Sequence, residues 1–352
     1  MEKFENLKQI VEKNWYINDI LRRIVFRKFN RELSAFENEI SKIDSIKDID
    51  AFSKEMKKIP KTILGSGYTH KRSYSENTIY GYASELMQYA GLENENMLYM
   101  PLLEHGVTYR TQLSQERYNF SSPYIFQGAF HKEEWVKHSK QKCYSIGPYI
   151  HYARDIYEQS KINSIKKKNG KTLLFFPAHS IEIGLDFEYR QKESYADSIW
   201  SDYIKDFDTA MACVYCLDFL NGVEEAIHNG PIKVVSAGFK TDPLFVRRLK
   251  TIINMADTVL YSCISSSIGY AFYLGKTVVA SVPENMMKGE DVISEANREL
   301  MRLFSLDNKA SDEERQKWVN DYWGLDQIKT KQEIADIYYE NKKRLTSHFG
   351  FK

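Results

Sequence analysis

The segment Asp257-Thr-Val-Leu-Tyr-Ser-Cys-Ile-Ser-Ser-Ser-Ile-Gly-Tyr-Ala-Phe-Tyr-Leu-Gly-Lys-Thr-Val-Val-Ala280 says more about the fold than any other part of the chain. It predicts a short buried strand, a serine-rich turn, an apolar helix followed by Gly275, and a second buried strand. Ser265, Ser266 and Ser267 stand where the helix should begin, and a helix start offers unpaired backbone N–H groups. Three hydroxyl groups at that position could bind a phosphate. The alternative is that one serine is an ordinary N-cap and the other two are simply small residues that fit the turn.

The alternation of strand and helix extends through the second half of the chain. Five short apolar runs, with helix-like stretches between them, occur there at residues 172–176, 210–216, 232–235, 258–261 and 277–280. Short apolar runs that alternate with helices are typical of a parallel sheet with helices on both faces. The second half is therefore predicted to be an α/β domain.

The first half shows the same alternation in a less regular form. Its apolar runs occur at residues 97–103, 124–127 and 143–148. The residues up to Lys58 predict amphipathic helices, and the chain is again predicted to be helical after Pro283. Both ends of the chain are therefore expected to be helical extensions of an α/β fold.

The polar stretch Lys166-Lys-Lys-Asn-Gly170 is the best candidate for a domain boundary. We therefore predict two Rossmann-like domains, the first over residues 1–165 and the second over residues 166–300. The helices of residues 301–352 are predicted to pack back across both domains.

The composition is that of a soluble globular protein, with 43% hydrophobic residues, 28% charged residues and a formal net charge of +1. A net charge so close to zero does not give the protein an overall positive potential that would attract nucleic acid. We therefore expect no nucleic-acid partner. The sequence has no run of eighteen apolar residues, and its first residues lack the apolar core of a signal peptide. We expect a cytoplasmic protein that lies, at most, on the inner face of a membrane.

Several common site motifs are absent from the sequence. It has no GxxxxGK[ST] loop, no GxGxxG between strand and helix, and no GxSxG elbow, which argues against Walker ATPases, dinucleotide enzymes and α/β-hydrolases. No His/Asp cluster has metal-ligand spacing, so we expect neither a metal nor a cofactor. Cys213 and Cys216 lie three positions apart in an apolar run, where strand geometry would point them to opposite faces. We therefore expect reduced, structural cysteines.

Polar residues follow the predicted strands of the second half at the points where the strands end. Those that suit a nucleotide phosphate are His179, Ser180, Gly238, Lys240, Ser265, Ser266 and Ser267. In an open parallel sheet, ligands bind at the carboxyl ends of the strands. This convergence indicates a ligand site in the second domain, although His179 has a capping or core role as its alternative.

Two alternating α/β halves, a late serine-rich turn and a His-containing loop after the first strand of the second half resemble glycosyltransferases of the GT-B fold. The details are similar to bacterial enzymes that build capsule, O-antigen or lipooligosaccharide, including sialyltransferase-like and Kdo-transferase-like groups. In those families a His-Pro loop and a Ser-rich loop hold the phosphate of a nucleotide sugar. Here residues 265–267 match the Ser-rich loop and His179 stands at the position of the His, but Ser180 replaces the Pro. Because the Pro is absent, the sequence does not determine the base of the donor nucleotide, and CMP is one candidate nucleotide.

The resemblance implies two domains that face a central cleft, with the acceptor in the first and the donor in the second. An inverting sugar transfer needs a carboxylate or a His that takes the proton of the acceptor hydroxyl. Glu104 or His105 is the candidate base, because the pair ends an apolar run and precedes Gly106. A salt-bridged Glu and a packed His are the alternative. The weaker candidates for acceptor binding are Gly67, Tyr68, His70 and Arg110.

The resemblance and the residues together predict a metal-independent, cofactor-free glycosyltransferase. It would move a sugar from a nucleotide sugar to a cell-surface glycan or lipid-linked glycan, in the cytoplasm or at the inner membrane. Two alternatives remain open. One is a phosphotransferase that moves a polyol phosphate from a CDP-linked donor, and the other is a non-catalytic protein that binds a nucleotide or a sugar.

Overall fold

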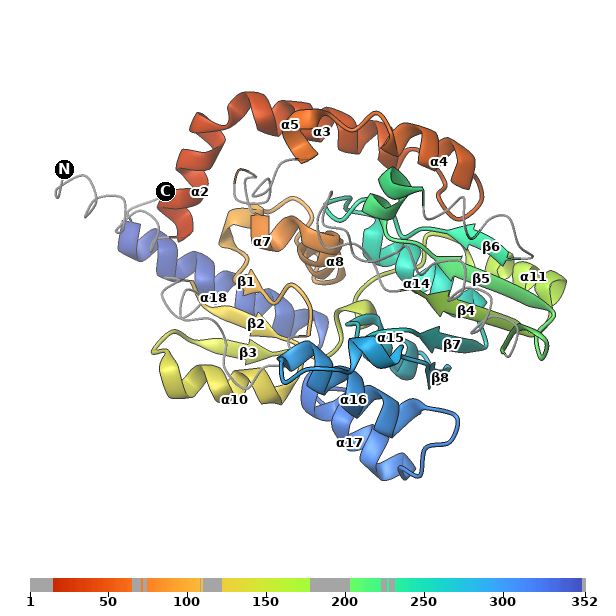
Figure 1. The fold of residues 1–352 in the computed structure, drawn as a ribbon. Helices are drawn as coiled ribbons and strands as arrows, with labels where there is room; N and C mark the ends of the chain where they lie inside the picture. Colours follow the sequence, from red (N-terminus) through yellow and green to blue (C-terminus); the bar gives the residue numbers. More distant parts are fainter. Residues whose placement is uncertain are drawn as a thin grey trace. The chain divides into compact units, whose positions relative to one another are not determined.

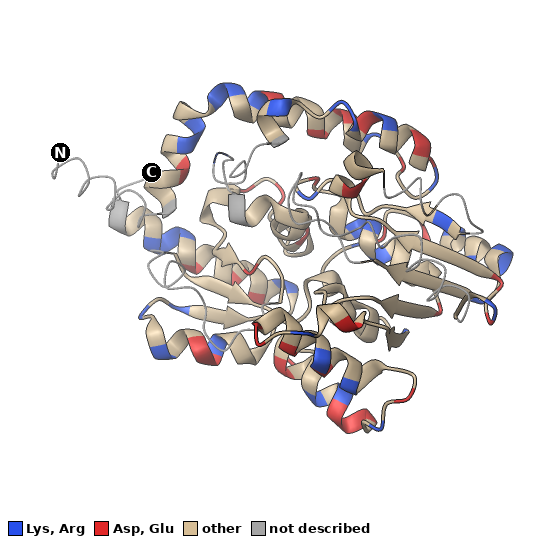
Figure 2. Ribbon diagram, viewed as in Figure 1, with Lys and Arg blue, Asp and Glu red and all other residues tan. Residues whose placement is uncertain are grey.

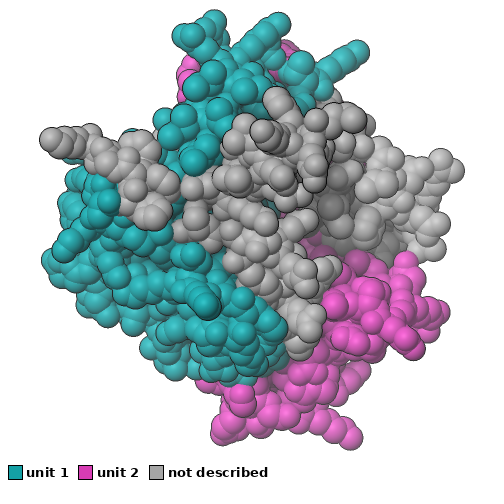
Figure 3. Space-filling view, turned by 90° about the vertical axis from the view of Figure 1, so that its left-hand side faces the viewer, with its two compact units in different colours: residues 1–35, 61–153, 318–352 teal, residues 36–60, 154–317 magenta. Residues whose placement is uncertain are grey.

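The computed structural model describes residues 15–64, 71, 75–107, 109, 122–177, 203–222, 227 and 232–349. The chain forms two compact units, which Figure 3 distinguishes by colour. Unit 1 comprises residues 1–35, 61–153 and 318–352, and unit 2 comprises residues 36–60 and 154–317. Helix α3 (Arg27–Ser41) contains residues of both units, as does helix α17 (Asp312–Trp323).

The centre of unit 2 is a five-stranded parallel sheet (Figure 1). Its strands are β4 (Thr172–Phe176), β5 (Thr209–Cys213), β6 (Ile232–Val235), β7 (Thr258–Tyr261) and β8 (Thr277–Ala280). They lie in the order β6-β5-β4-β7-β8, and Leu173 of the central strand pairs with Ala210 on one side and Thr258 on the other. Each of the five predicted apolar runs therefore forms a strand, as expected where both faces of a sheet are covered. The run 210–216 is a strand only as far as Cys213, because Cys216 begins a 3-10 helix.

Helices cover this sheet and bury their apolar sides. The described helices of unit 2, besides those that it shares with unit 1, are α4 (Ile49–Met56), α11 (Gln159–Asn169), η5 (Cys216–Asn221), α14 (Phe245–Met255), α15 (Ser267–Tyr273), η6 (Glu284–Met286) and α16 (Val292–Phe304). Helix α11 packs against α14, and both α15 and α16 pack against β8. In α14, the buried residues Val246, Leu249 and Ile253 recur at helical spacing, which explains why this segment is an amphipathic helix.

Unit 1 contains a smaller parallel sheet in the order β1-β2-β3. Its strands are β1 (Leu102–Leu103), β2 (Tyr124–Phe126) and β3 (Cys143–Ser145), and its helices are α2 (Trp15–Val25), α5 (Lys61–Leu64), α7 (Ser75–Thr78), η1 (Ile79–Gly81), α8 (Tyr82–Tyr89), η2 (Met97–Tyr99), α10 (Ala129–His138), η3 (Tyr149–His151) and α18 (Lys331–Phe349). One core cluster joins α2, the sheet, α10 and α18 through Tyr16, Leu102, Tyr124, Phe126, Trp135 and Leu345. Strands β1 and β2 are therefore buried between helices from both ends of the chain.

The predicted fold class is confirmed: the chain has two parallel α/β units with helices near both ends of the sequence. The limits of the units differ from the predicted domains 1–165, 166–300 and 301–352. The proposed boundary at Lys166 lies in the last turn of α11, where its ammonium group is 2.9 Å from the Asp257 carboxylate of unit 2. A run of lysines at a helix end is favourable for the helix dipole, so this polar stretch caps a helix.

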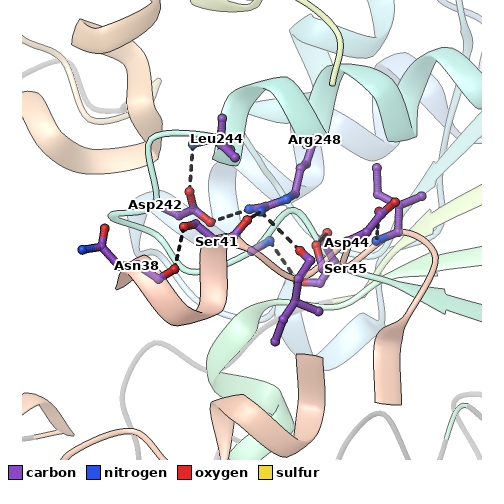
Figure 4. Close-up of polar contacts among 11 residues, drawn as sticks. Asn38, Ser41, Asp44, Ser45, Asp242, Leu244 and Arg248 are labelled. Carbon is purple, nitrogen blue, oxygen red and sulfur yellow. Dashed lines mark hydrogen bonds and ion pairs between the residues drawn. The ribbon is translucent and has the colours of Figure 1, made fainter. Parts of the chain in front are cut away.

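A buried ion pair fixes the end of α3 to the loop after β6 (Figure 4). The guanidinium of Arg248 donates to the carboxylate of Asp242, and both side chains are almost fully buried. Its second terminal nitrogen donates to the carbonyl oxygens of Ser41, at 2.8 Å, and Ile43, at 3.4 Å. The carbonyl groups at a helix end carry partial negative charge, which suits a cation.

Gly238 allows the Arg248 side chain to approach the loop. Its φ is +102°, and a Cβ at this position would lie 2.7 Å from the Arg248 Nη1 atom. Any larger residue would therefore strain the backbone and displace the guanidinium. Gly238 was predicted to bind the donor, and the structure shows this packing role.

We expect the replacement Arg248→Met to lower the free energy of unfolding by about 3–5 kcal/mol, because Asp242 would remain buried without its cation. Urea unfolding followed by circular dichroism measures this change. The control Lys54→Met removes an exposed charge of α4 and should change stability by about 0.5 kcal/mol or less. Equal losses in the two variants would contradict a central role for the ion pair.

Candidate functional site

The strand order of unit 2 brings the carboxyl ends of β4 and β7 side by side. The chain passes from β4 through β5 to β6 at one edge, and then returns to place β7 on the other side of β4. In open parallel sheets, ligands bind in the crevice at such a switch point. The loop after β7 carries Ser265, Ser266 and Ser267, so the predicted phosphate-binding serines lie at this place in the sheet.

The three serines have different roles in the turn. The hydroxyl groups of Ser265 and Ser267 are 2.9 Å apart, and the Ser267 backbone N–H donates to Ser265 Oγ at 3.3 Å. Helix α15 begins at Ser267, as predicted, and the side chain of its N-cap residue, Ser266, makes no capping hydrogen bond. Ser265 and Ser267 therefore hold the turn, and Ser266 stands at the N-cap position, so all three remain the predicted phosphate contacts.

Buried hydrogen bonds fix the serine loop in place. The backbone N–H of Ile264 donates to the side-chain oxygen of Asn297 at 2.7 Å, and the Asn297 amide donates to the Met286 carbonyl at 3.0 Å. Asn297 belongs to α16 and is fully buried. The sequence prediction missed this residue, although a polar side chain on the apolar side of an amphipathic helix is a recognisable signal.

Lys240 follows the edge strand β6, so it is separated from the serine loop by β5 and β4. Neighbouring strands lie about 4.8 Å apart, which puts the ends of β6 and β7 roughly 14 Å from each other. Burial lowers the pKa of the Lys240 ammonium from 10.5 to about 8. A cation that has lost part of its hydration gains more from an anionic ligand than an exposed one does. Lys240 and the serines are therefore suited to different parts of one ligand.

Unit 1 has a second cluster of polar groups, again where parallel strands end. Glu104 follows β1, is fully buried, and its carboxylate accepts from the Gln127 backbone N–H at 3.1 Å. The other carboxylate oxygen lies 2.7 Å from Nδ1 of His131, in the first turn of α10. Within the described part of the chain, His131 Nε2 has no hydrogen-bond partner. A carboxylate beside one ring nitrogen resembles the arrangement of a general base, but both nitrogens of His131 are buried.

The surroundings of His131 are aromatic and closely packed. The ring centroid of His131 lies 5.4 Å from that of Phe130 and 6.0 Å from that of Tyr322. Gly128, which precedes α10, allows α17 to come this close, because a Cβ there would lie 2.3 Å from the Asp321 carbonyl oxygen. The aromatic rings thus shield the Glu104–His131 pair from water.

Glu104 and His105, predicted as alternative candidates for the base, have different surroundings in the structure. The Glu104 carboxylate contacts His131, while His105 is half-buried in the turn that follows. His131 was not predicted, because its partner is 27 positions away in the sequence and no motif links them. The predicted residues that lie outside the described part of the chain are Gly67, Tyr68, His70, Arg110, His179 and Ser180.

The cysteines and the described acidic residues show no metal site. Cys213 and Cys216 are free and buried, as predicted, and burial raises the pKa of each thiol to about 12. Such thiols remain protonated at neutral pH and are poor metal ligands. Among the described residues, no three His, Cys, Asp or Glu side chains are grouped to hold a metal ion. Within those same ranges, no helix has the length and apolar character that spanning a bilayer requires.

No protein-family model and no curated protein matches this chain. Similar solved structures include a UDP-forming α,α-trehalose-phosphate synthase from Burkholderia xenovorans, with 10% identity, 73% of this chain and 71% of that chain covered, and a TM-score of 0.33. Arabidopsis thaliana UGT89C1 has 10% identity, coverages of 75% and 60%, and a TM-score of 0.31. The trehalose-6-phosphate synthase OtsA has 12% identity, coverages of 66% and 60%, and a TM-score of 0.30. Likenesses at this level assign neither a family nor an activity to the chain.

The depressed pKa of Lys240 predicts a pH-dependent gain in stability for Lys240→Met. Folded Lys240 loses its proton near pH 8, whereas the unfolded chain keeps it up to 10.5. The unfolded state therefore binds more protons between these values, so the wild-type free energy of unfolding rises with pH there. The variant should be more stable than the wild type by about 1–3 kcal/mol below pH 8, and this advantage should shrink towards pH 10.5. Urea unfolding across this range, with the exposed Lys205→Met as control, measures it; an advantage that is independent of pH would contradict the assignment.

The position of Ser266 predicts that Ser266→Ala weakens the binding of a nucleotide phosphate. A hydrogen bond to a charged group contributes about 1.5–3 kcal/mol, which corresponds to a loss of roughly 10- to 100-fold in affinity. The matched control is Ser281→Ala, because Ser281 follows the edge strand β8. Calorimetric titration with whichever of CMP, CDP, UDP, GDP or ADP binds most tightly gives both affinities. If the two variants bind equally well, the serine loop does not hold the phosphate.

Proposed function

We propose that this chain is a glycosyltransferase that takes a sugar from a nucleotide-sugar donor. In the reaction, an acceptor hydroxyl oxygen forms a bond to the anomeric carbon of the sugar, and the bond from that carbon to the donor phosphate breaks. The acceptor proton passes to a base on the protein, and the nucleotide leaves with the negative charge. Inverting stereochemistry and independence from metal ions are parts of the proposal.

The observation that carries the proposal is the switch point of the unit 2 sheet, with the serine loop directly beside the end of β4. Hydroxyl groups at such a position suit a phosphate, and the desolvated Lys240 supplies a cation along the same edge of the sheet. The chain lacks the GxxxxGK[ST] and GxGxxG loops, so a mononucleotide leaving group is favoured over ATP hydrolysis or a dinucleotide cofactor. Residues 178–180, after β4, are proposed to complete the donor site through His179 and Ser180.

Unit 1 is proposed to bind the acceptor and to supply the base. The support is the Glu104–His131 pair. The buried Nε2 atom of His131 has no hydrogen-bond partner among the described residues, and it is proposed to take the proton while Glu104 stabilises the imidazolium that forms. His105 is the second candidate for the same role. Gly67, Tyr68, His70 and Arg110 remain proposed acceptor contacts.

The finer identity of the substrates belongs to this proposal as well. A cell-surface glycan, as in capsule, O-antigen or lipooligosaccharide synthesis, is the proposed acceptor, with a CMP-linked sugar among the candidate donors. The support is the combination of residues 265–267 with a His-containing loop, by which the chain resembles sialyltransferase-like and Kdo-transferase-like enzymes. The proposed place of action is the cytoplasm, including the cytoplasmic face of the inner membrane.

Incubation of the purified chain with nucleotide sugars tests the proposal directly. Thermal-shift screening against five nucleotides selects the donor base, since a ligand at a hundred times its Kd stabilises by about 2.7 kcal/mol. We then expect slow release of free sugar without acceptor, and transfer when a glycan acceptor is added, both in the presence of EDTA. Release of a sugar or polyol phosphate would indicate a phosphotransferase, and binding without turnover would indicate a binding protein. Activity that needs added magnesium or manganese would contradict metal independence.

The base is tested by comparing His131→Gln, Glu104→Gln and His105→Gln in the transfer assay. General-base catalysis is typically worth 10²–10⁴-fold, so His131→Gln should lower kcat on that scale. Glu104→Gln should also lower kcat, because the carboxylate that would stabilise the imidazolium is lost. His105→Gln is expected to retain most of the activity.

The circular dichroism spectrum and the thermal midpoint serve as the control for folding in these three variants, and nucleotide affinity shows that the proposed donor site in unit 2 is unchanged. A large loss of kcat in His105→Gln alone would transfer the role to His105. Near-normal turnover in all three variants would place the base elsewhere in the chain.

A further inference from the structure

The outer side of α2 and the first turns of α3 combines exposed apolar groups with cations. Leu21, Ile24 and Val25 are 39%, 68% and 68% exposed. They are three of the seven large apolar side chains that are exposed in the described ranges, and they lie within five positions of one another. The other four are scattered singly, as is usual for a surface, so this group needs an explanation of its own.

The exposed groups form one continuous stripe along the helices. Leu21, Ile24, Val25, Lys28 and Arg31, which we call the outer stripe, recur at the spacing of one helix face. Helix α2 ends at Val25 and α3 begins at Arg27, but the helical hydrogen bonds pass through the junction. The N–H of Phe26 donates to the Arg22 carbonyl at 2.9 Å, and that of Asn30 donates to the Phe26 carbonyl at 2.8 Å. The opposite side is buried through Tyr16, Phe29 and Leu33, so the outer stripe is a surface of unit 1.

The charge around the outer stripe is strongly positive. Figure 2 shows basic residues along α2 and the start of α3, and the cations there are Arg22, Arg23, Arg27, Lys28 and Arg31. Of the two acidic residues nearby, Asp19 is buried and paired with Arg23 at 3.1 Å, and Glu32 lies 3.9 Å from Lys28. The exposed cations Arg27 and Arg31 thus stand beside exposed apolar groups. This combination complements a surface that offers both hydrocarbon and negative charge.

We infer that the outer stripe binds the surface of an anionic phospholipid bilayer. An amphipathic helix with cations beside its apolar residues lies in the plane of the membrane, with the apolar groups at the acyl boundary and the cations at the lipid phosphates. This surface goes beyond the proposed glycosyl transfer, because it needs neither the donor site nor the base. A second copy of the chain is the competing occupant.

Flotation of the full chain with vesicles tests the inference without any substrate. The vesicles contain either phosphatidylcholine alone or phosphatidylcholine with about 30 mol% phosphatidylglycerol. We expect the wild type to float only with the anionic vesicles. The triple variant R27Q/K28Q/R31Q should bind them on the order of 100-fold more weakly, since each cation near such a surface contributes about fivefold. The variant I24S/V25S should also lose binding, by about 10-fold or more.

The matched control is the triple variant V136S/K137Q/K140Q, which removes an exposed apolar residue and two exposed cations of the α10 region of unit 1. It should bind like the wild type. Because all substituted residues are exposed, an unchanged circular dichroism spectrum and thermal midpoint in every variant will show that the chain is folded. Failure of the wild type to float, or equal losses in the control, would overturn the inference. Concentration-dependent dimerisation that disappears in I24S/V25S would also overturn it, because a second copy would then occupy the stripe.

Discussion

The buried ion pair between Arg248 and Asp242 fixes the loop after β6, which also carries Lys240. Taking both charges out of water is costly, so the pair is favourable only when its geometry is good and its remaining hydrogen bonds are made. The carbonyl oxygens of Ser41 and Ile43 accept hydrogen bonds from Nη2 of Arg248. Because Gly238 has no side chain, there is room beside it for the Nη1 atom. These contacts are among those that join residues 36–60 to unit 2, with the ring contacts Phe36–Phe239 and Phe52–Phe219, although the predicted domain limits place the segment in the first domain. A single guanidinium therefore joins helix α14, the end of α3 and the loop that leads to Lys240.

Both units gather their chemistry where parallel strands end. Parallel strands all finish at one edge of the sheet, so the loops that follow them are brought together even when they are far apart in sequence. In unit 2 this edge carries hydroxyl groups and a partly desolvated cation. In unit 1 it carries a fully buried carboxylate beside an imidazole. One side is thus suited to an anionic leaving group and the other to a proton, which are the two charges that a sugar transfer has to accommodate.

Close packing keeps the polar groups of unit 1 in place. Gly128 lets the backbone of α17 lie directly against the start of α10, and Tyr322 is thereby held near the His131 ring. A buried carboxylate without a partner would take up a proton or disrupt the fold, so the contact with His131 also has a structural reason.

The sequence by itself determined the elements. The sequence predicted strands β4 to β8, the start of α15 at Ser267 and the helices near both ends. These elements were predictable because the periodicity of strands and helices depends on residues that are close in the sequence. Only the tertiary structure decided the order β6-β5-β4-β7-β8, and with it that the serine loop adjoins β4 while Lys240 stands three strands from β7. It also decided that Glu104 pairs with His131 and that residues 318–352 join unit 1. These outcomes depend on contacts between residues that are distant in the chain, for which local patterns of hydrophobicity and charge carry no signal.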